Sequence, residues 1–363
     1  MSKIVTFGEI MARMAPSGVL RLGQVLPGSL DVTFAGAEAN VAASLAMLGE
    51  DVEFVTALPE SPLTSACLAN LRSVGIGTQN LQISKQGRFG IYFVEMGANQ
   101  RPSRVYYDRQ HSSISLAKPG DFDWQSILAG AEWLHLTGIT PAISKSAAET
   151  TLEAARIARK MQVRVSCDVN FRSKLWRWDP TRTPQTLAGA VLRELMPLVN
   201  LLMANEEDGR LLGVTLSDPV PAGNDSQKHI ERATAFAQEL YRHYPNLEFV
   251  STTLREQLSA SRNNWGALLL ETRTAETMLS PVRDGKYQPY EIRNIVDRVG
   301  SGDAYDAGLL FGLSRSGFDL QRTLDFATAA ACLAHSVVGD WNYATQVEIE
   351  ELMEGSGSGR VVR

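Results

Sequence analysis

The sequence predicts an α/β protein with a mostly parallel central sheet, helices on both faces of that sheet, and a small inserted β sheet. Two observations predict this. Short apolar runs alternate with longer segments of helical periodicity over most of the 363 residues, which is typical of a parallel sheet covered on both faces. Two stretches, 12–35 and 89–109, instead alternate polar with apolar residues and have no helical segment between their runs, which indicates β strands with one solvated face.

The strands of the main sheet are predicted by buried, β-rich runs at 3–7, 52–56, 133–137, 163–168, 201–204 and 249–253. Between and after them, apolar residues recur every three or four positions, which predicts helices. The predicted helices are 37–48, 63–74, 145–161, 304–316 and 320–337.

The two alternating stretches carry DVTFA, GIYFVEMG and SRVYYDR. We expect them to form antiparallel strands of a separate sheet, a lid inserted into a discontinuous main domain of residues 1–11, 36–88 and 110–352. The segment SDPVPAGNDSQK at 217–228 predicts a surface loop, and 353–363, with EGSGSGR, predicts a flexible tail.

Composition excludes several classes of function. A net charge of -5 and a pI near 5.7 leave no basic stripe for nucleic acid. Cys67, Cys167 and Cys332 lie far apart, and with the scattered histidines they show no disulfide or zinc spacing, which favours a reducing compartment. The N-terminus MSKIVTFGEIM lacks the regions of a signal peptide, and no apolar run approaches a membrane span. We therefore expect a cytoplasmic protein whose partner is a small molecule.

One segment carries most of the functional information: NIVDRVGSGDAYDAG, residues 294–308. Gly300, Ser301 and Gly302 lead into a predicted helix, so their backbone N–H groups could converge on an anion at its positive end. Asp303 follows directly, where a carboxylate could accept the proton of an attacking hydroxyl. The sequence therefore predicts an anion hole and a base on adjacent residues.

The same string has plainer interpretations. Gly-Ser-Gly-Asp is also compatible with a turn in which Asp303 only caps a helix. A dinucleotide fingerprint is disfavoured because the third glycine and a following acidic ribose ligand are missing. No GxxxxGK[ST] pattern occurs, so a P-loop kinase is excluded.

Together with Asp297 and Gly308, this segment resembles the C-terminal signature of the ribokinase-like (PfkB-type) carbohydrate kinases. The string FAGAEANVA, residues 34–42, resembles the N-terminal glycine motif of the same family. The chain is most similar to the branch that phosphorylates 2-keto-3-deoxygluconate, through GEIM (8–11), GIYF (90–93), RPSRVYYDR (101–109), DVNFRSKLW (168–176), NEED (205–208), HSVVGDWN (335–342) and GSGRVVR (357–363).

The resemblance implies a ribokinase-like three-layer sandwich with a β lid, and ATP and Mg²⁺ as cofactors. It also implies Asp303 as the base and a set of residues that contact the sugar acid: Gly36, Asn40, Tyr92, Tyr107, Arg109, Arg172 and Asp340. Physical chemistry supports the two arginines independently, because a substrate carboxylate calls for the planar donors of Arg. Either arginine could also be a solvated surface charge, and we expect this less of Arg172 because it follows the buried run 163–170. Tyr92 and Tyr107 could equally serve lid packing.

The nucleotide side departs from the wider family. The family's Asn-x-x-Glu motif, which helps to hold Mg²⁺ through water, is replaced by Asn205 and Asp208, with Glu207 as a rival ligand. The segment 251–266 replaces a short Gly-rich turn with a longer stretch, and we expect Thr253 and Arg255 to border ATP together with Asn205, Gly300 and Gly302.

These expectations define a kinase in which Asp303 deprotonates a primary hydroxyl of the sugar acid while Gly300–Asp303 amides and Mg²⁺ hold the developing charge. The rivals are a kinase for another sugar, such as fructose or 5-keto-2-deoxygluconate, and a non-catalytic sugar-acid sensor, against which Gly300, Gly302 and Asp303 argue. The family analogy also implies a monovalent-cation site near Asp297 and Val299. The apolar residues of GIYFVEMG favour a homodimer, or a higher homo-oligomer, paired through the lid.

Overall fold

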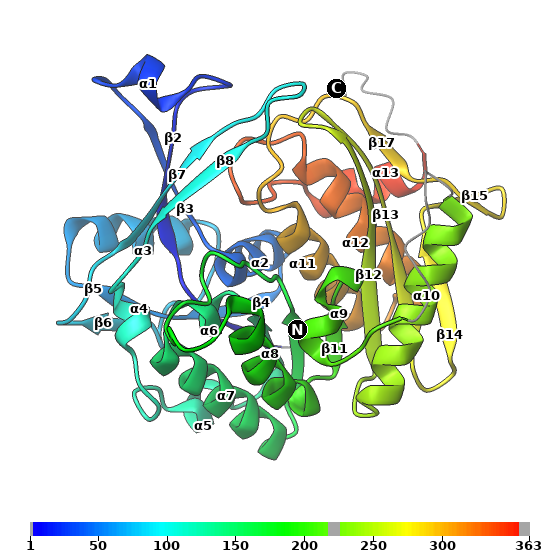
Figure 1. Ribbon diagram of the computed structural model, residues 1–363, viewed down its shortest axis with the longest axis horizontal. Coiled ribbons are helices and arrows are strands. Elements are labelled where there is room, and N and C mark those ends of the chain that lie inside the picture. Colours follow the sequence, from blue (N-terminus) through cyan, green and yellow to red (C-terminus); the bar gives the residue numbers. More distant parts are fainter. Residues whose placement is uncertain (1–2, 217–225, 356–363) are drawn as a thin grey trace.

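The computed structural model describes residues 3–216 and 226–355, and its largest feature is a nine-stranded sheet (Figure 1). The strand order is β14-β13-β12-β11-β10-β9-β1-β4, with β17 paired to β13. The six predicted strands are the six that run parallel; β13, β14 and β17 are added antiparallel. The bounds are β1 Lys3–Phe7, β4 Asp51–Val55, β9 Ala131–Thr137, β10 Arg164–Asp168, β11 Leu201–Met203, β12 Phe249–Ser259, β13 Arg262–Glu271, β14 Glu276–Ser280 and β17 Tyr290–Ile292.

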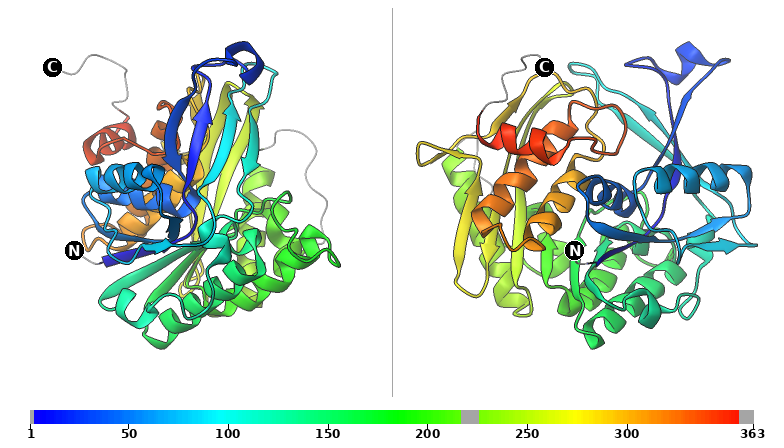
Figure 2. Two further views of the ribbon diagram at one scale, coloured as in Figure 1. Left: turned by 90° about the vertical axis from the view of Figure 1, so that its left-hand side faces the viewer. Right: turned by 180° about the vertical axis from the view of Figure 1, so that it is seen from behind.

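Helices cover both faces of this sheet, so the domain has three layers. The first face packs against α4 Ser113–Leu116, α5 Trp124–Ile127, α6 Thr140–Ile143, α7 Lys145–Lys160, α8 Pro184–Leu195, α9 Gly209–Leu212 and α10 Ser226–His243. The second face packs against α2 Ala37–Met47, α3 Pro62–Ser73, α11 Ser301–Leu313, α12 Leu320–Ala334 and α13 Gln346–Met353, which the rear view in Figure 2 shows in blue and in orange to red. The predicted fold class is confirmed.

Alternation along the strands divides the core between the two faces. In β1, Val5 and Phe7 belong to the core under α5 and α7, whereas Ile4 belongs to the core under α2 and α12. Successive side chains of a strand point to opposite faces, so an entirely apolar strand is buried on both sides. Cys67 and Cys167 are buried free thiols and Cys332 is a half-buried one, as small apolar side chains would be.

The second sheet rises from the main body at the upper left of Figure 1. Its order is β3-β2-β7-β8, with bounds β2 Met11–Ala15, β3 Asp31–Ala35, β7 Gly90–Glu95 and β8 Arg104–Asp108. The expectation of antiparallel pairing is wrong at one place, because β2 and β7 run parallel. Both strands leave the main body in the same direction, β2 closely after β1, so their pairing has to be parallel.

Other details differ from the sequence expectations. The 12–35 stretch includes a four-residue helix, α1 Leu22–Val25, and the 251–266 segment is a hairpin of β12 and β13. Residues 226–228 belong to α10 and not to a loop, while 217–225 and 356–363, where the rest of the loop and most of the tail were expected, lie outside the described residues. Smaller elements are β5 Ala57–Pro59 with β6 Gln82–Ser84, β15 Val282–Arg283 with β16 Lys286–Tyr287, and the 3₁₀ turns η1 Met196–Leu198 and η2 Glu206–Asp208.

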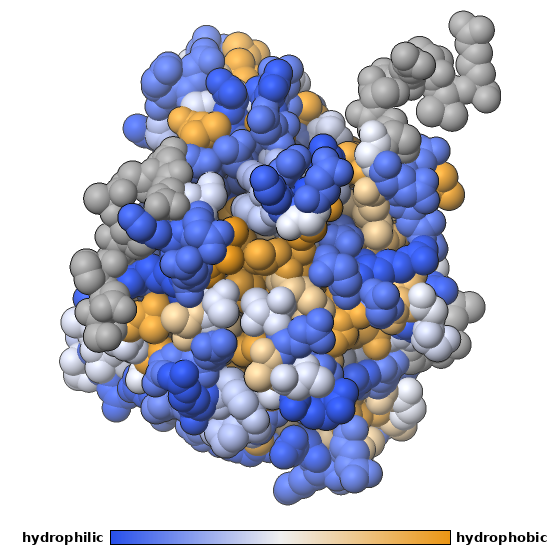
Figure 3. Space-filling model, turned by 90° about the vertical axis from the view of Figure 1, so that its right-hand side faces the viewer, coloured by the Kyte–Doolittle hydropathy of each residue, from blue (hydrophilic) through white to orange (hydrophobic). Residues whose placement is uncertain are grey.

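Within the described ranges, no helix is both long and apolar enough to cross a membrane. The face in Figure 3 shows hydrophilic residues around an irregular apolar area.

Candidate active site

A cleft of about 1210 Å³ lies between the second sheet and the carboxyl ends of the parallel strands. Ligands of open α/β sheets bind at this edge. The structure brings every residue predicted for the site to this one cleft: Gly36, Asn40, Tyr92, Tyr107, Arg109, Arg172, Asn205, Asp208, Thr253, Arg255, Gly300, Ser301, Gly302, Asp303 and Asp340.

The glycine-rich segment forms the N-terminus of α11. The helix starts at Ser301, three residues earlier than expected, after Gly300 at φ 89°. Because the first turn of a helix has no internal acceptors for its N–H groups, the amides of Ser301, Gly302 and Asp303 are free to meet an anion at the cleft. The segment predicted to form an anion hole is thus the N-terminus of a helix and not a separate loop.

Asp303 lies inside that first turn and is buried, with 8% of its surface exposed. The capping position belongs to Gly300, and the Asp303 carboxylate accepts a hydrogen bond from Asn40 Nδ2 at 2.6 Å. Burial raises the pKa of Asp303 to about 8; the Asn40 bond opposes the rise, and the charges of Asp168 and Asp340 add to it. The interpretation of Asp303 as a helix cap is therefore wrong.

Two further carboxyls adjoin Asp303 and were missed in the sequence: Asp306, which is buried, and Asp168, which is half-buried. Asp168 ends β10, and Asp306 lies one helical turn beyond Asp303 on α11. Burial raises the pKa of both; the charge of Asp208 adds to the rise at Asp168, and the charges of Asp168 and Asp303 add to the rise at Asp306. The signal for Asp168 was available, since it stands at the carboxyl end of a parallel strand.

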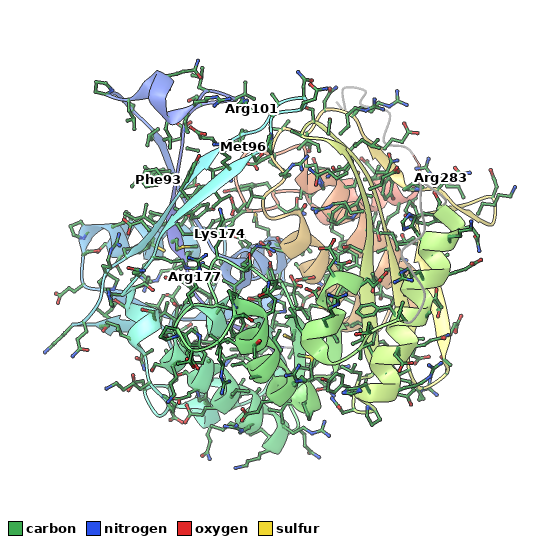
Figure 4. All side chains as sticks on the ribbon, viewed as in Figure 1. Phe93, Met96, Arg101, Lys174, Arg177 and Arg283 are labelled. Carbon is green, nitrogen blue, oxygen red and sulfur yellow. The ribbon has the colours of Figure 1, made fainter. Side chains whose placement is uncertain are left out.

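The two predicted arginines differ from expectation in their burial. Arg109 is buried, lies over the ring of Tyr107 at 5.3 Å, and donates from Nε to Glu9 Oε2 at 2.6 Å. Arg172 is exposed, and among the described residues its hydrogen bond goes to the carbonyl of Phe171 at 3.3 Å. The expectation that Arg172 would be the less exposed arginine is wrong, because it lies two residues past the end of the buried segment. Figure 4 shows Lys174 and Arg177 on the same loop, below the second sheet.

Asp340 is already engaged within the protein. Tyr92 donates its hydroxyl to Asp340 Oδ2 at 2.7 Å, and Arg13 contacts Oδ1. Arg13, on β2, was not predicted, although Met11, Arg13 and Ala15 alternate onto the same face of the sheet.

Gly36 and Asn40 are held together at the start of α2. Gly36 N donates to Asn40 Oδ1 at 3.2 Å, and a Cβ on Gly36 would lie 1.9 Å from the carbonyl oxygen of Glu9. Only glycine permits this approach, which positions the Asn40 amide toward Asp303.

The three residues predicted to border the nucleotide, Asn205, Thr253 and Arg255, all line the cleft. Thr253 Oγ1 donates to Asn205 Oδ1 at 3.3 Å. The Arg255 side chain is exposed at the cleft, but partial desolvation of its guanidinium, together with the charge of Arg172, lowers its pKa. Two like charges so placed favour a polyanion between them.

The acidic groups fit Mg²⁺ only when it is carried by a nucleotide. Within the described residues no cluster of three or more ligating side chains could hold a metal by itself. Mg²⁺ usually keeps waters and phosphate oxygens and takes one or two carboxylates. Asp208 is half-buried at the cleft and accepts from Asn205 N at 2.9 Å, whereas Glu207 is exposed.

Comparison with known proteins gives the same class of enzyme as the sequence motifs. The model of the pfkB family of carbohydrate kinases matches residues 1–344. The crystal structure of 2-dehydro-3-deoxygluconokinase from Thermotoga maritima is 41% identical, with a TM-score of 0.86 over 98% of this chain and 100% of that one. A 2-dehydro-3-deoxygalactonokinase of Haloferax volcanii is 29% identical over 99% of this chain and 98% of its own. A putative ribokinase II of E. coli, 18% identical, shares the fold with a TM-score of 0.73 over 98% of this chain and 100% of that one.

The site and fold thus define an enzyme that transfers a phosphoryl group to a carbohydrate hydroxyl. The chain belongs to the pfkB family of carbohydrate kinases, and its fold is ribokinase-like.

Proposed function

We propose that this carbohydrate kinase phosphorylates 2-keto-3-deoxygluconate with ATP, giving 2-keto-3-deoxy-6-phosphogluconate. The observation that carries the proposal is a cleft lined both by arginines and by a buried carboxylate at a helix N-terminus. The 41% identity to a 2-dehydro-3-deoxygluconokinase over nearly the whole of both chains supports the same substrate.

In the proposed mechanism Asp303 accepts the proton of the primary hydroxyl as the phosphoryl group meets it in line. The amides of Ser301, Gly302 and Asp303 hold the charge that develops on the phosphoryl oxygens. Mg²⁺, with Asp208 nearby, would neutralise charge on the nucleotide phosphates. Asn205, Thr253 and Arg255 would bind the nucleotide.

The substrate carboxylate would lie by Arg172 and Arg109. Tyr92 and Tyr107 are on the same face of the second sheet, since they are opposite each other in the β7–β8 pairing. That sheet would then act as a lid that keeps water from the phosphoryl group. The division of the chain into a main domain and a lid is part of this proposal. We also propose that the protein is located in the cytoplasm.

A second acceptor is favoured by a specific finding. The Haloferax relative is named for the galactonate compound, which differs from the gluconate compound in configuration at C4.

The test is an acceptor panel with ATP and Mg²⁺ that scores ADP release and identifies the product by mass. We expect the two keto-deoxy acids to exceed 5-keto-2-deoxygluconate, fructose and ribose by at least about tenfold in kcat/KM. A preference for a neutral sugar would refute the proposed substrate.

We also propose a homodimer formed through the outer face of the second sheet. Register places Val32, Met14, Phe93 and Tyr106 in one row across the four strands. This row lies on the face opposite Arg13, Tyr92 and Tyr107, and Val32 and Tyr106 are 50% and 43% exposed. An apolar row of this kind on a sheet face favours pairing with another copy.

A further inference from the structure

Arg13 is a buried cation that no step of the proposed mechanism uses. It lies on β2, opposite Thr33 of β3 and Tyr92 of β7, and 2% of its surface is exposed. Its Nη1 contacts Asp340 Oδ1, its Nη2 contacts Asp297 Oδ2, and Nη2 also lies 3.8 Å from Met96 Sδ. Figure 4 shows Met96 at the far end of the second sheet. The Arg13 side chain therefore crosses from the second sheet to Asp297 and Asp340 of the main domain.

Asp297 fixes the backbone that leads into the anion hole. Its Oδ1 accepts from Arg298 N at 2.7 Å and Val299 N at 3.1 Å, and its Oδ2 accepts from Gly339 N at 3.2 Å. With Arg13 on Oδ2, the carboxylate has four donors. A carboxylate offers about four acceptor positions, so the Asp297 side chain is fully used.

Asp340 fixes the other side of the same turn. A Cβ on Gly300 would lie 2.0 Å from the carbonyl oxygen of Asp340, so the backbone at 340 abuts the residue that begins α11. Its carboxylate is occupied by Arg13 and by Tyr92. Asp297 and Asp340 thus flank Gly300, and both are almost entirely buried.

Two buried carboxylates side by side require a compensating positive charge. The family analogy implies a monovalent cation near Asp297 and Val299. The oxygen ligands that remain do not fit that ion. The four acceptor positions of Asp297 are taken by hydrogen bonds, and a guanidinium already bridges both acids. A planar guanidinium with two forward donors suits this bridge.

We propose that Arg13 is a positioning residue whose guanidinium is the built-in counter-ion of the anion hole. It takes the place of a monovalent cation and ties the second sheet to the turn that presents the Ser301–Asp303 amides. The inference rests on the proposed use of this turn in phosphoryl transfer, but not on which sugar acid is the acceptor.

The first test uses the unaltered enzyme. Phosphorylation of its best acceptor is measured in potassium, sodium, caesium and tetramethylammonium chloride at equal ionic strength. We expect kcat to agree within about twofold across the series. A tenfold or greater requirement for potassium would overturn the proposal.

The second test removes the guanidinium. We expect Arg13→Met to lower kcat by about a hundredfold, as for misplacement of a catalytic group by about 1 Å, with KM for ATP changed much less. Added guanidinium chloride at tens of millimolar should restore at least about a tenth of the lost activity. Arg88→Met is the control, since Arg88 pairs with Asp108 on the same sheet at an exposed position. Near-normal kcat in Arg13→Met, or a loss that guanidinium leaves unchanged, would overturn the positioning role.

A third measurement does not depend on activity. Hydrogen exchange at the amides of Arg298 and Val299, which bond to Asp297, should become at least tenfold faster in Arg13→Met and stay unchanged in Arg88→Met. Unchanged exchange in both variants would overturn the proposal even if the acceptor assignment holds. Faster exchange in an enzyme that phosphorylates no keto-deoxy acid would refute only the acceptor. If Arg13→Met does not fold, Arg13→Lys, which keeps one point charge but not the planar pair of donors, serves in the kcat and hydrogen-exchange measurements with the same expected direction.

Discussion

Asp303 is buried, with a pKa raised to about 8, but it accepts a short hydrogen bond from Asn40 and sits in the first turn of α11. Burial favours the neutral acid, whereas the Asn40 amide and the helix end favour the carboxylate. The group therefore changes charge near physiological pH, where a general base is most effective.

The assignment of Asp303 as the base is tested by Asp303→Asn. This substitution preserves size and can keep a hydrogen bond to residue 40, but it removes the proton acceptor. We expect kcat to fall by about two to four orders of magnitude while the Kd values for acceptor and ATP change by a few-fold at most. Isothermal titration alongside steady-state kinetics checks both. Turnover within a few-fold of the wild-type enzyme would refute the base.

Asn40→Ala tests the electrostatic account through pH. The base must be ionised, so kcat/KM for the acceptor should rise with pH and level off above a pKa of about 8 in the wild-type enzyme. The lost hydrogen bond favoured the ionised form, so the variant's rising limb should move to higher pH. A limb that stays in place, with kcat merely lower at every pH, would mean that Asn40 only positions substrate.

Arg172→Ala tests the carboxylate contact. We expect kcat/KM for the keto-deoxy acid to fall by an amount that corresponds to a loss of roughly 2 to 5 kcal/mol in transition-state binding if the pair is desolvated in the complex. Activity on neutral sugars should change far less. Lys174→Ala, on the same loop and also exposed, is the matched control. Equal losses on charged and neutral acceptors would point to a structural arginine.

At the scale of elements, sequence reasoning located each of the six parallel strands, because a short, β-rich and mostly buried run between helical segments has few alternatives. It placed the start of α11 three residues too late, since glycine and serine were taken as loop residues although the turn is made by Gly300 alone. Every predicted site residue lines the cleft, because motifs at the carboxyl ends of parallel strands meet at one edge. Arg13 and Glu9 were missed because their partners are remote in sequence and no local pattern marks such pairs.

Two glycines of one motif allow a matched test of the helix N-terminus. At Gly300 the positive φ and the nearby Asp340 carbonyl exclude a side chain, whereas a Cβ on Gly302 meets nothing within 4 Å. Gly302→Ala should keep or raise stability by up to about 1 kcal/mol in a helix, but its methyl would project where the phosphoryl group passes. We expect Gly302→Ala to show normal thermal unfolding with at least about tenfold lower kcat. Gly300→Ala should lower both the thermal stability and kcat. Full activity in Gly302→Ala would exclude contact of the phosphoryl group with this turn.

At the scale of the whole molecule, the four-stranded sheet has two faces with different chemistry. One face carries Arg13, Tyr92 and Tyr107, of which the two tyrosines line the cleft, and the other face carries the apolar row that ends in Tyr106. Because successive side chains of a strand alternate, the residue that lines the site and the residue that would contact a second copy are neighbours in the chain. Pairing of two such sheets would therefore stiffen the strands that hold Arg13 and Tyr92.

Phe93→Asp tests this consequence. Phe93 lies between the buried residues Tyr92 and Val94 on β7 but points to the outer face (Figure 4), where it is paired with Tyr106 on β8. A buried, unpaired carboxylate would oppose association, so light scattering after gel filtration should show a monomer where the wild-type chain gives a dimer. We expect KM for the acceptor to rise several-fold, since the separated sheet would close less often over the cleft, while ATP binding is retained. Val282→Asp, an exposed position on β15 outside this sheet, should leave both properties unchanged. A wild-type monomer, or a Phe93→Asp dimer with normal kinetics, would refute pairing through this face.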